Sequence, residues 1–219
     1  MVLKAEAILL DLDGTLVDST DSIARSWLRW CRQYDVDPAR LAGAHGRTTA
    51  DIVAGLLPGP QVSAALARID EIEIEDAGTV RPMPGAAELL ASIPADRRAI
   101  VTSGSTVIAT ARMRAAGLEP AAVIVTADDV LRGKPHPEPY LLGAQRLGAD
   151  PARCVVVEDA PSGIAAARAA GMAVVGVVST HEARQLEADL VAASPAHIRV
   201  DGTGPLLVDV TPRVGRDRR

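Results

Sequence analysis

The sequence predicts an α/β fold, with a doubly wound parallel sheet interrupted by a helical insert. Short apolar runs rich in Val and Ile alternate with Ala-rich helical stretches along most of the chain. Continuous apolar runs of this length suit strands that are buried on both faces, as in a parallel sheet. From about Leu16 to Val80 this alternation stops and only helical patterning remains. The three clearest helices of the remaining chain are each followed by glycine, which favours the left-handed conformation that ends helices.

The predicted elements follow one another regularly. Strands are expected at residues 7–12, 99–102, 122–125, 154–157 and 173–178, with a possible last strand at 206–210. Helices are expected at residues 106–116, 140–147 and 164–170, ending at Gly117, Gly148 and Gly171. Strands and helices in alternation indicate an open sheet with helices on both faces.

The insert is expected to form a small helical domain at residues 16–80, so that residues 1–15 and 81–219 make up the α/β core. Ile23, Trp27, Trp30 and Tyr34 recur at helical spacing. We interpret this stripe as the core of the insert, and a stripe facing a substrate or a second subunit is the alternative. A later acidic run is interpreted as a solvated helix face. It contains Asp70, Glu71, Glu73, Glu75 and Asp76.

Composition excludes several classes of protein. A net charge of −5 with no early basic block disfavours binding to nucleic acid or to an anionic membrane surface. Aromatic residues make up 2% of the chain, which removes the stacking platforms of single-strand binders. No apolar run approaches the ~18 residues of a membrane span, and no signal sequence is evident. Cys31 and Cys154 match no paired metal-ligand spacing, so we expect reduced thiols in a soluble cytoplasmic protein.

The chemistry is expected at the carboxyl ends of the strands, where open α/β sheets bind ligands. The first strand leads into Asp11-Leu12-Asp13-Gly14-Thr15. Two carboxylates separated by one residue would repel each other, and a divalent cation such as Mg²⁺ would relieve that repulsion. Gly14 would let the backbone come close to a ligand. The alternative is that these residues simply form a turn.

Three further segments place polar groups at strand ends or in a neighbouring loop. Ser103 and Gly104 begin a helix, where a hydroxyl and backbone N–H groups can hold phosphate; an ordinary helix cap is the alternative. Lys134 lies in a loop stiffened by three prolines, in a chain with 21 Arg and only two Lys, which favours a specific role for this cation. Glu158 and Asp159 are adjacent carboxylates at the end of a buried strand, and a helix cap at Asp159 is the alternative.

Together the four segments resemble the haloacid dehalogenase superfamily of phosphotransferases that use an aspartate nucleophile. The matching pieces are DLDGT at 11–15, TSGS at 102–105, GKPHPEPY at 133–140 and VVVEDAPSGIAAARAAG at 155–171. The resemblance extends to about Thr180 and implies a Rossmann-like core with the insert as a helical cap. Residues 44–48, Ala-His-Gly-Arg-Thr, resemble the cap of sugar-, polyol- and glycerol-phosphate phosphatases of the β-phosphoglucomutase-like branch.

The resemblance implies a role for each acidic residue. Asp11 would attack phosphorus and form an aspartyl-phosphate. Asp13 would protonate the leaving alkoxide and then deprotonate the hydrolytic water. Mg²⁺ would be held by the Asp11 carboxylate, the Asp13 backbone carbonyl and Asp159. Glu158 would act on the metal through water or by orienting a ligand.

The resemblance also implies two groups of binding residues. The transferred phosphate would be bound by Ser103, Gly104 and Lys134. The rest of the substrate would be contacted by His45, Gly46, Arg47 and Ser105. The expected ligand is a small phosphorylated metabolite.

Residues that are present or missing separate the possible reactions. Haloacid dehalogenases lack the second aspartate, so Asp13 favours phosphoryl transfer. Phosphonate hydrolases need a cap lysine, and no lysine lies between Lys4 and Lys134. The same absence counts against a hexose-phosphate mutase, although Arg47 could substitute.

We therefore predict a Mg²⁺-dependent phosphatase acting on a small phosphorylated sugar, polyol or glycerol phosphate. A β-phosphoglucomutase-like mutase is one alternative. The alternative from another class is a non-catalytic phosphoacceptor or regulatory module, although receiver domains of that kind are about half this length and have no cap.

Overall fold

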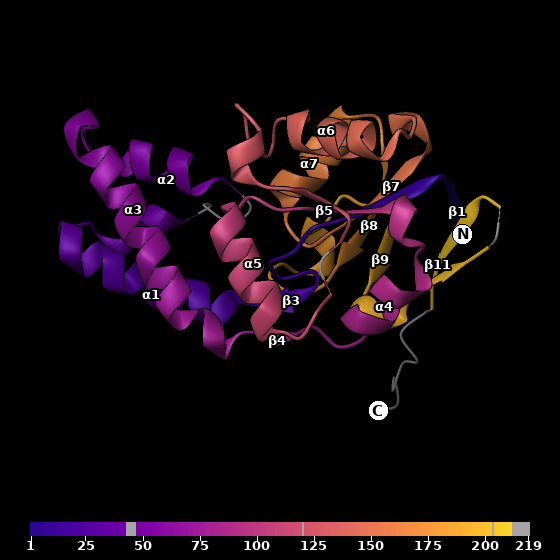
Figure 1. The fold of residues 1–219 in the computed structure, drawn as a ribbon, viewed down its shortest axis with the longest axis horizontal. Coiled ribbons are helices and arrows are strands. Elements are labelled where there is room, and N and C mark those ends of the chain that lie inside the picture. The colour runs from indigo at the N-terminus through magenta and orange to yellow at the C-terminus, as the bar shows by residue number, and fades with distance from the viewer. Residues whose placement is uncertain (43–46, 120, 203, 212–219) are drawn as a thin grey trace.

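A six-stranded parallel sheet forms the centre of the computed structural model, which describes residues 1–42, 47–119, 121–202 and 204–211 (Figure 1). The strand order is β6-β5-β2-β7-β8-β9, and every neighbouring pair is parallel. The strands are β2 (Ala7–Leu10), β5 (Arg98–Val101), β6 (Val123–Val125), β7 (Cys154–Glu158), β8 (Ala173–Val177) and β9 (Leu190–Ala192). The predicted α/β fold with a parallel sheet is confirmed.

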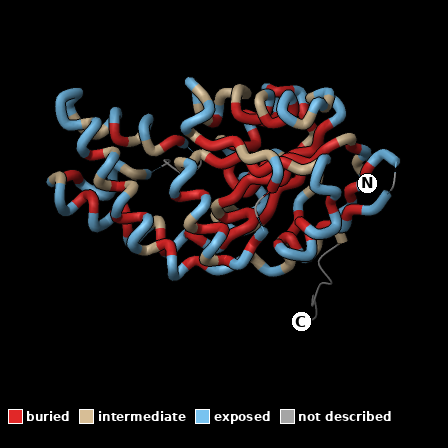
Figure 2. Tube along the Cα trace, viewed as in Figure 1, coloured by how far each residue is buried: buried red, intermediate tan, exposed pale blue. Residues whose placement is uncertain are grey.

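Helices cover both faces of this sheet. One face packs against α4 (Ala86–Ser92) and α5 (Thr106–Ala115), the other against α6 (Glu138–Leu147) and α7 (Pro161–Ala169). Successive side chains of a strand point to opposite faces, so both faces need apolar residues. In β2, Ile8 and Leu10 join the core on the α4–α5 side, whereas Leu9 joins the core on the other side. The strands are accordingly the most continuously buried part of the chain (Figure 2).

The predicted helix ends are confirmed. Gly148 ends α6 in the left-handed region, with a φ of 65°. Gly117 and Gly171 lie just beyond the ends of α5 and α7, with φ of 65° and 78°. Short 3₁₀ turns occur elsewhere, at Pro38–Leu41, Ala77–Thr79, Ala95–Arg97, Ala127–Asp129, Pro151–Arg153, Ala183–Gln185 and Pro195–His197.

The possible last strand exists as β11 (Leu206–Val210), but it does not join the parallel sheet. It pairs antiparallel with β1 (Val2–Ala5) and β10 (Ile198–Asp201) in a separate three-stranded sheet. Both β10 and β11 bury every second residue, because only one face of this sheet meets the core. Alternating burial of this kind gives no continuous apolar run, so β10 was not predicted from the sequence, and neither were β1 and the three-residue β9.

The insert lies at one end of the molecule (Figure 1), and its described part contains the α-helices α1 (Thr20–Tyr34), α2 (Thr49–Leu56) and α3 (Gly59–Asp76). A two-residue strand pair, β3 (Val17–Asp18) with β4 (Arg81–Pro82), joins the chain where it leaves and re-enters the core. Because this strand pair closes the two ends of the insert, we propose that residues 16–80 form the cap domain. Within the described residues, no helix is long and apolar enough to cross a membrane.

The aromatic stripe is the core of the insert and also part of a cavity wall. Trp30 is fully buried, and its indole N–H donates to the carbonyl of Ala65, 2.9 Å away. Ile23 and Tyr34 pack at the edge of the same cluster. Ile23 and Trp27 also line the cavity described below, so part of the stripe faces that cavity as well as the core of the insert. Cys31 and Cys154 are buried and free.

Candidate active site

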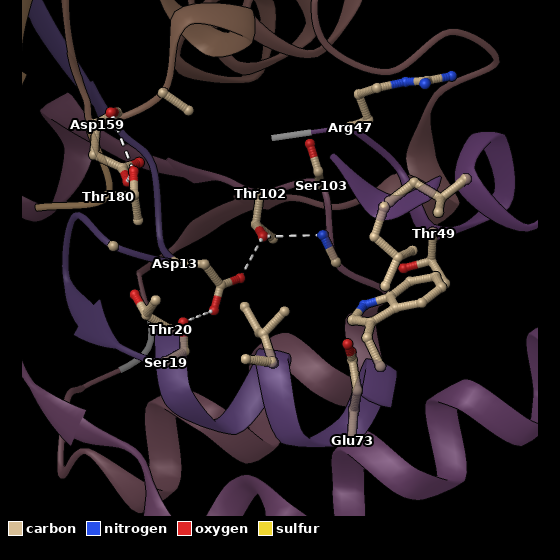
Figure 3. A pocket seen from close by; sticks show the side chains of 18 of the residues that line it. Asp13, Ser19, Thr20, Arg47, Thr49, Glu73, Thr102, Ser103, Asp159 and Thr180 are labelled. Carbon is tan, nitrogen blue, oxygen red and sulfur yellow. Dashed lines mark hydrogen bonds between the residues drawn. The ribbon is translucent and has the colours of Figure 1, made fainter. Parts of the chain in front are cut away.

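A cavity of about 370 Å³ lies between the carboxyl ends of the central strands and the helices of the insert. Asp11 follows β2, Thr102 follows β5, and Glu158 ends β7, and these three strands are adjacent in the sheet. After β2 the chain adds β5 and β6 on one side of that strand, and then β7, β8 and β9 on the other side. Open α/β sheets bind ligands at such a switch point, which here lies between β2 and β7. Figure 3 shows the cavity with the two carboxylates Asp13 and Asp159 on its core side.

Lys134 is the buried cation of the site. Its side chain is 1% exposed, and its ammonium group donates to Asp11 Oδ1 at 2.7 Å, to Glu158 Oε1 at 2.8 Å and to the Val101 carbonyl at 3.0 Å. Burial acts to lower the pKa of Lys134, but the two carboxylates outweigh it and hold that pKa well above its ordinary value. Lys134 therefore stays charged, and it lies beside Asp11 at the carboxyl ends of the central strands.

The Glu158 carboxylate is fully engaged. Besides Lys134, its Oε1 accepts from the Tyr140 hydroxyl at 3.1 Å, and its Oε2 accepts from the backbone N–H groups of Asp159 and Ala160, both at 2.8 Å. A Cβ at Gly163 would lie 1.6 Å from Oε1, so only glycine fits there. Glu158 is thus locked in one orientation. This rigidity suits a group that orients its neighbours.

Asp159 is held by hydroxyl groups from the loop after β8. Its Oδ2 accepts from Ser179 at 3.2 Å and from Thr180. A Cβ at Gly14, whose φ is +87°, would lie 2.2 Å from the same oxygen. Burial, together with the nearby Glu158, raises the pKa of Asp159 to about 7. The helix-cap alternative is wrong for Asp159, because Ala160 is the N-cap of α7.

These acidic groups fit a divalent cation. Oxygens of Asp11, Glu158 and Asp159 all lie within 4.8 Å of one another. Three carboxylates face a single ammonium group, and Asp11 Oδ2 is buried without a hydrogen-bond partner. Burial raises the pKa of Asp11 well above its usual value and outweighs the opposing charge of Lys134. A buried oxygen with no partner, in a cluster with excess negative charge, matches the hard-oxygen preference of Mg²⁺.

The Asp13 side chain points away from that cluster and is held by three other groups. Its Oδ1 accepts from the Ser19 hydroxyl at 2.7 Å and pairs with Arg112 Nη1 at 2.9 Å. The Thr102 hydroxyl lies 3.5 Å from Oδ2 (Figure 3). The Asp13 carboxylate therefore faces the cavity and lies apart from the cluster of Asp11, Glu158 and Asp159. This position suits a group that transfers a proton to or from the substrate. Its contribution to a metal would come from the backbone, as predicted.

The residues expected to contact substrate are only partly brought together. Ser103 and Gly104 line the cavity, and the Gly104 N–H donates to the Thr102 hydroxyl at 3.1 Å. The alternative that Ser103 is a helix N-cap is wrong, because Ser105 is the N-cap residue of α5. Ser105 is not among the described residues that line the cavity, and its hydroxyl is buried without a hydrogen-bond partner.

The cap segment is represented by Arg47, which is exposed and lines the cavity. Figure 3 shows its side chain at the rim, on the opposite side from Glu73. The other two predicted residues of this segment, His45 and Gly46, lie outside the residues that the structure describes.

One member of the acidic run contradicts its interpretation as a solvated face. Glu73 is 4% exposed and lines the cavity, whereas Glu71 and Glu75 of the same helix are exposed. Its Oε2 lies 3.2 Å from Nη2 of Arg112, a buried residue of α5. Burial raises the pKa of Glu73 to about 7, against the opposing charge of Arg112. The core helix α5 packs against α3 along this face, which explains why this acid is enclosed.

Several residues of the site carried no usable signal in the sequence. Arg112 is one of 21 arginines and occupies an ordinary helical position. Ser19 lies at the start of α1 and resembles any helix-capping serine. Ser179 and Thr180, by contrast, could have been predicted from the sequence. They come shortly after β8, which is the strand next to β7 in the sheet, and ligands bind at such strand ends.

The chain is similar to known proteins along most of its length. The family model for haloacid dehalogenase-like hydrolase matches residues 8–177. Hexitol phosphatase A of Escherichia coli is 41% identical, over 90% of this chain and 95% of its own. Glycerol-1-phosphate phosphohydrolase 2 of Saccharomyces cerevisiae is 33% identical, over 91% of this chain and 86% of its own. Among solved structures, a hydrolase from Pseudomonas syringae matches with a TM-score of 0.79 at 28% identity, covering 87% of this chain and 94% of that chain.

These matches cover the α/β core and the helical insert, and they include the four motifs that the sequence placed at the ends of the strands and in the loop before α6. The chain therefore belongs to the haloacid dehalogenase-like hydrolases and is an enzyme, as those motifs predicted.

Proposed function

We propose that this enzyme is a Mg²⁺-dependent phosphatase that hydrolyses the monophosphate ester of a small sugar, polyol or glycerol through an aspartyl-phosphate. One observation carries the proposal: Asp11 lies at the cavity with one oxygen fixed by Lys134 and the other without a partner. An oriented carboxylate beside a buried cation suits attack on a phosphate dianion, because the cation offsets the meeting of two negative charges. The phosphatase relatives from Escherichia coli and Saccharomyces cerevisiae support the substrate class.

The residues present can carry both halves of the reaction. An Asp11 oxygen forms a bond to phosphorus while the bond from phosphorus to the substrate oxygen breaks, and protonated Asp13 gives its proton to the leaving alkoxide. Asp13 then accepts a proton from the water that hydrolyses the aspartyl-phosphate. Ser103 and the Gly104 backbone would bind the oxygens of the transferred group, with Lys134 offsetting their charge.

The metal would be held by the Asp11 carboxylate, the Asp13 backbone carbonyl and Asp159, with Glu158 orienting these ligands. Bound Mg²⁺ supplies positive charge against the oxygens of the transferred phosphoryl group. Arg47, with His45 and Gly46, would contact the part of the substrate that does not react.

A hydrolysis screen tests the proposal. Purified enzyme is assayed with p-nitrophenyl phosphate and with phosphorylated polyols, sugars, glycerol and nucleotides, with Mg²⁺ and after chelation. We expect Mg²⁺-dependent release of phosphate, fastest with sugar or polyol monophosphates. Failure to hydrolyse any phosphomonoester with Mg²⁺ would contradict the proposal and favour the non-catalytic alternative. Conversion of a hexose 1-phosphate into its 6-phosphate without net release would instead favour the mutase.

The acid/base role of Asp13 predicts an effect that depends on the leaving group. Asp13→Asn should fold, because the amide oxygen can still accept from Ser19 and Arg112. The value of kcat/KM for an alkyl phosphate should fall by about 10²–10⁴-fold. The loss with p-nitrophenyl phosphate should be much smaller, because p-nitrophenolate leaves without protonation. Equal losses on the two substrates would count against Asp13 as the acid.

Metal affinity should depend on pH, because the metal-free pKa of Asp159 lies at about 7. The protonated carboxyl must lose its proton before it binds Mg²⁺, so rising pH strengthens binding. Between pH 6 and pH 8 the fraction of ionised Asp159 increases about tenfold. The dissociation constant for Mg²⁺ should fall by at least about that factor, because Asp11, whose pKa burial also raises, must be ionised as well. Calorimetric titration in buffers of different ionisation enthalpy measures both the affinity and the released proton. An affinity that does not change over this range would refute the assignment.

A further inference from the structure

The wall that the cap contributes to the cavity is mainly apolar. Ile23, Trp27, Leu28, Leu41 and Ile52 all line it. Among the described cap residues of this wall, Glu73 is the acidic one. Figure 3 shows its carboxyl group pointing from α3 into the cavity. An acidic side chain enclosed by apolar residues is costly unless it has a partner, and the partners of Glu73 are Arg112 and the indole N–H of Trp27.

Arg112 connects this cap residue to the core. Its Nη1 lies 2.9 Å from Asp13 Oδ1, and its Nη2 lies 3.2 Å from Glu73 Oε2. Arg112 is 3% exposed. Glu73, Arg112 and Asp13 thus form one line of charges that runs from the cap to the residue proposed to protonate the leaving group.

The ion pair between Glu73 and Arg112 is not built as a structural bridge. An arginine that only tied the cap to the core would use its planar fork for two parallel hydrogen bonds to the carboxylate. Here one nitrogen approaches Glu73, and neither Nη2 nor Nε of Arg112 makes a hydrogen bond. Buried donors left without hydrogen bonds cost stability, so these two nitrogens need an explanation, and a ligand in the cavity is one.

A hydroxyl group is the ligand that this arrangement suits. A carboxylate accepts a hydrogen bond from a hydroxyl, and an ionised one repels a second phosphate or a carboxylate on the substrate. The apolar walls beside Glu73 suit the carbon chain of the same alcohol. The hydroxyl would lie on the leaving alcohol, because Asp13, which serves the leaving oxygen, is the next charged group along the line.

We propose that Glu73 accepts a hydrogen bond from a hydroxyl of the leaving alcohol, with Arg112 positioning its carboxylate, and so selects neutral polyhydroxy monophosphates over substrates with a second anionic group. This inference rests on the proposed phosphatase function. Glu73 is a specificity residue of the cap, and Arg112 acts through Glu73 and Asp13.

Three substrates and a matched control test this role. Wild type, Glu73→Gln and Glu71→Gln are compared on a hexitol monophosphate, a hexose bisphosphate and p-nitrophenyl phosphate at saturating Mg²⁺. Glu71 lies on the same helix and faces solvent, so its variant makes the same chemical change outside the cavity. Two ratios are measured: kcat/KM for the hexitol monophosphate and kcat/KM for the hexose bisphosphate, each divided by kcat/KM for p-nitrophenyl phosphate.

For Glu73→Gln we expect the hexitol ratio to fall about tenfold, the typical worth of a hydrogen bond to a charged group. The bisphosphate ratio should rise, because the repelling charge is gone. Glu71→Gln should change neither ratio. A role of Glu73 only in positioning Arg112 and Asp13 would lower the hexitol and bisphosphate ratios together and would spare p-nitrophenyl phosphate, so it could not raise the bisphosphate ratio.

Unchanged ratios in Glu73→Gln, or an equal fall of the hexitol and bisphosphate ratios, would overturn the inference. If that variant does not fold, Glu73→Asp is the second variant. Its shorter side chain keeps the negative charge but moves the carboxylate away from the substrate hydroxyl, so it should lower the hexitol ratio alone. A wild type that hydrolyses p-nitrophenyl phosphate but no polyol phosphate would also overturn the inference while leaving a phosphatase. A wild type inactive on every phosphomonoester would instead overturn the proposed function itself.

Discussion

Asp11→Asn should reduce turnover of every phosphomonoester by at least about 10⁴-fold, since it removes the attacking oxygen of the proposed reaction and a metal ligand together. The amide has nearly the same shape, and its oxygen can still accept from Lys134, so the fold should persist. Asp18→Asn is the matched control, because Asp18 lies shortly after Asp11 and is exposed. The measurement is steady-state phosphate release by both purified variants. Turnover retained in Asp11→Asn would overturn the covalent mechanism.

The same variant should be more stable than wild type when Mg²⁺ is absent. Burial raises the pKa of Asp11, which means that folding disfavours its ionised form, and asparagine removes that penalty. A gain of 1 kcal/mol would raise the melting temperature by about 2–4 °C in a chain of this size. Differential scanning calorimetry with chelator measures the shift. A lower melting temperature than that of wild type would show that the Lys134 pairing outweighs the burial of the charge.

Lys134→Met should be the most destabilising of the substitutions considered. The change keeps a long linear side chain but leaves Asp11 and Glu158 facing each other without a cation. Removing one partner of a buried ion pair costs about 3–5 kcal/mol of unfolding free energy. Loss of a charge that stabilises the transferring phosphoryl group should lower kcat by at least about 100-fold as well. Urea unfolding and steady-state kinetics measure the two effects.

The chain supplies its own control for this experiment. Lys4, the other lysine, is exposed in β1, and Lys4→Met should change stability by less than about 0.5 kcal/mol. Mg²⁺ should restore part of the stability of Lys134→Met, since a divalent cation supplies positive charge to the same carboxylates. If Lys134→Met matched Lys4→Met in both stability and turnover, Lys134 would have no role in the site.

Sequence patterns were sufficient to predict the candidate site residues that lie at the ends of buried strands. Asp11 and Glu158 follow strands that read as continuous apolar runs, and parallel strands necessarily bring such ends to one edge of a sheet. Lys134 could be singled out because lysine is so rare in this chain. Patterns were weaker where only one face of an element is covered, as β10 and β11 show.

The sequence by itself determined the parallel sheet, the helical insert and the carboxylates at the ends of its strands, because buried parallel strands read as continuous apolar runs and their carboxyl ends meet at one edge of the sheet. Only the tertiary structure decided which acid of the run on α3 enters the cavity. Glu71, Glu73 and Glu75 differ little in sequence, yet Glu73 alone among them is enclosed, because α5 of the core packs over its side of the helix. Arg112 became its partner for the same reason. Burial of a charge depends on what a distant segment places against it, and helical periodicity within one segment does not contain that information.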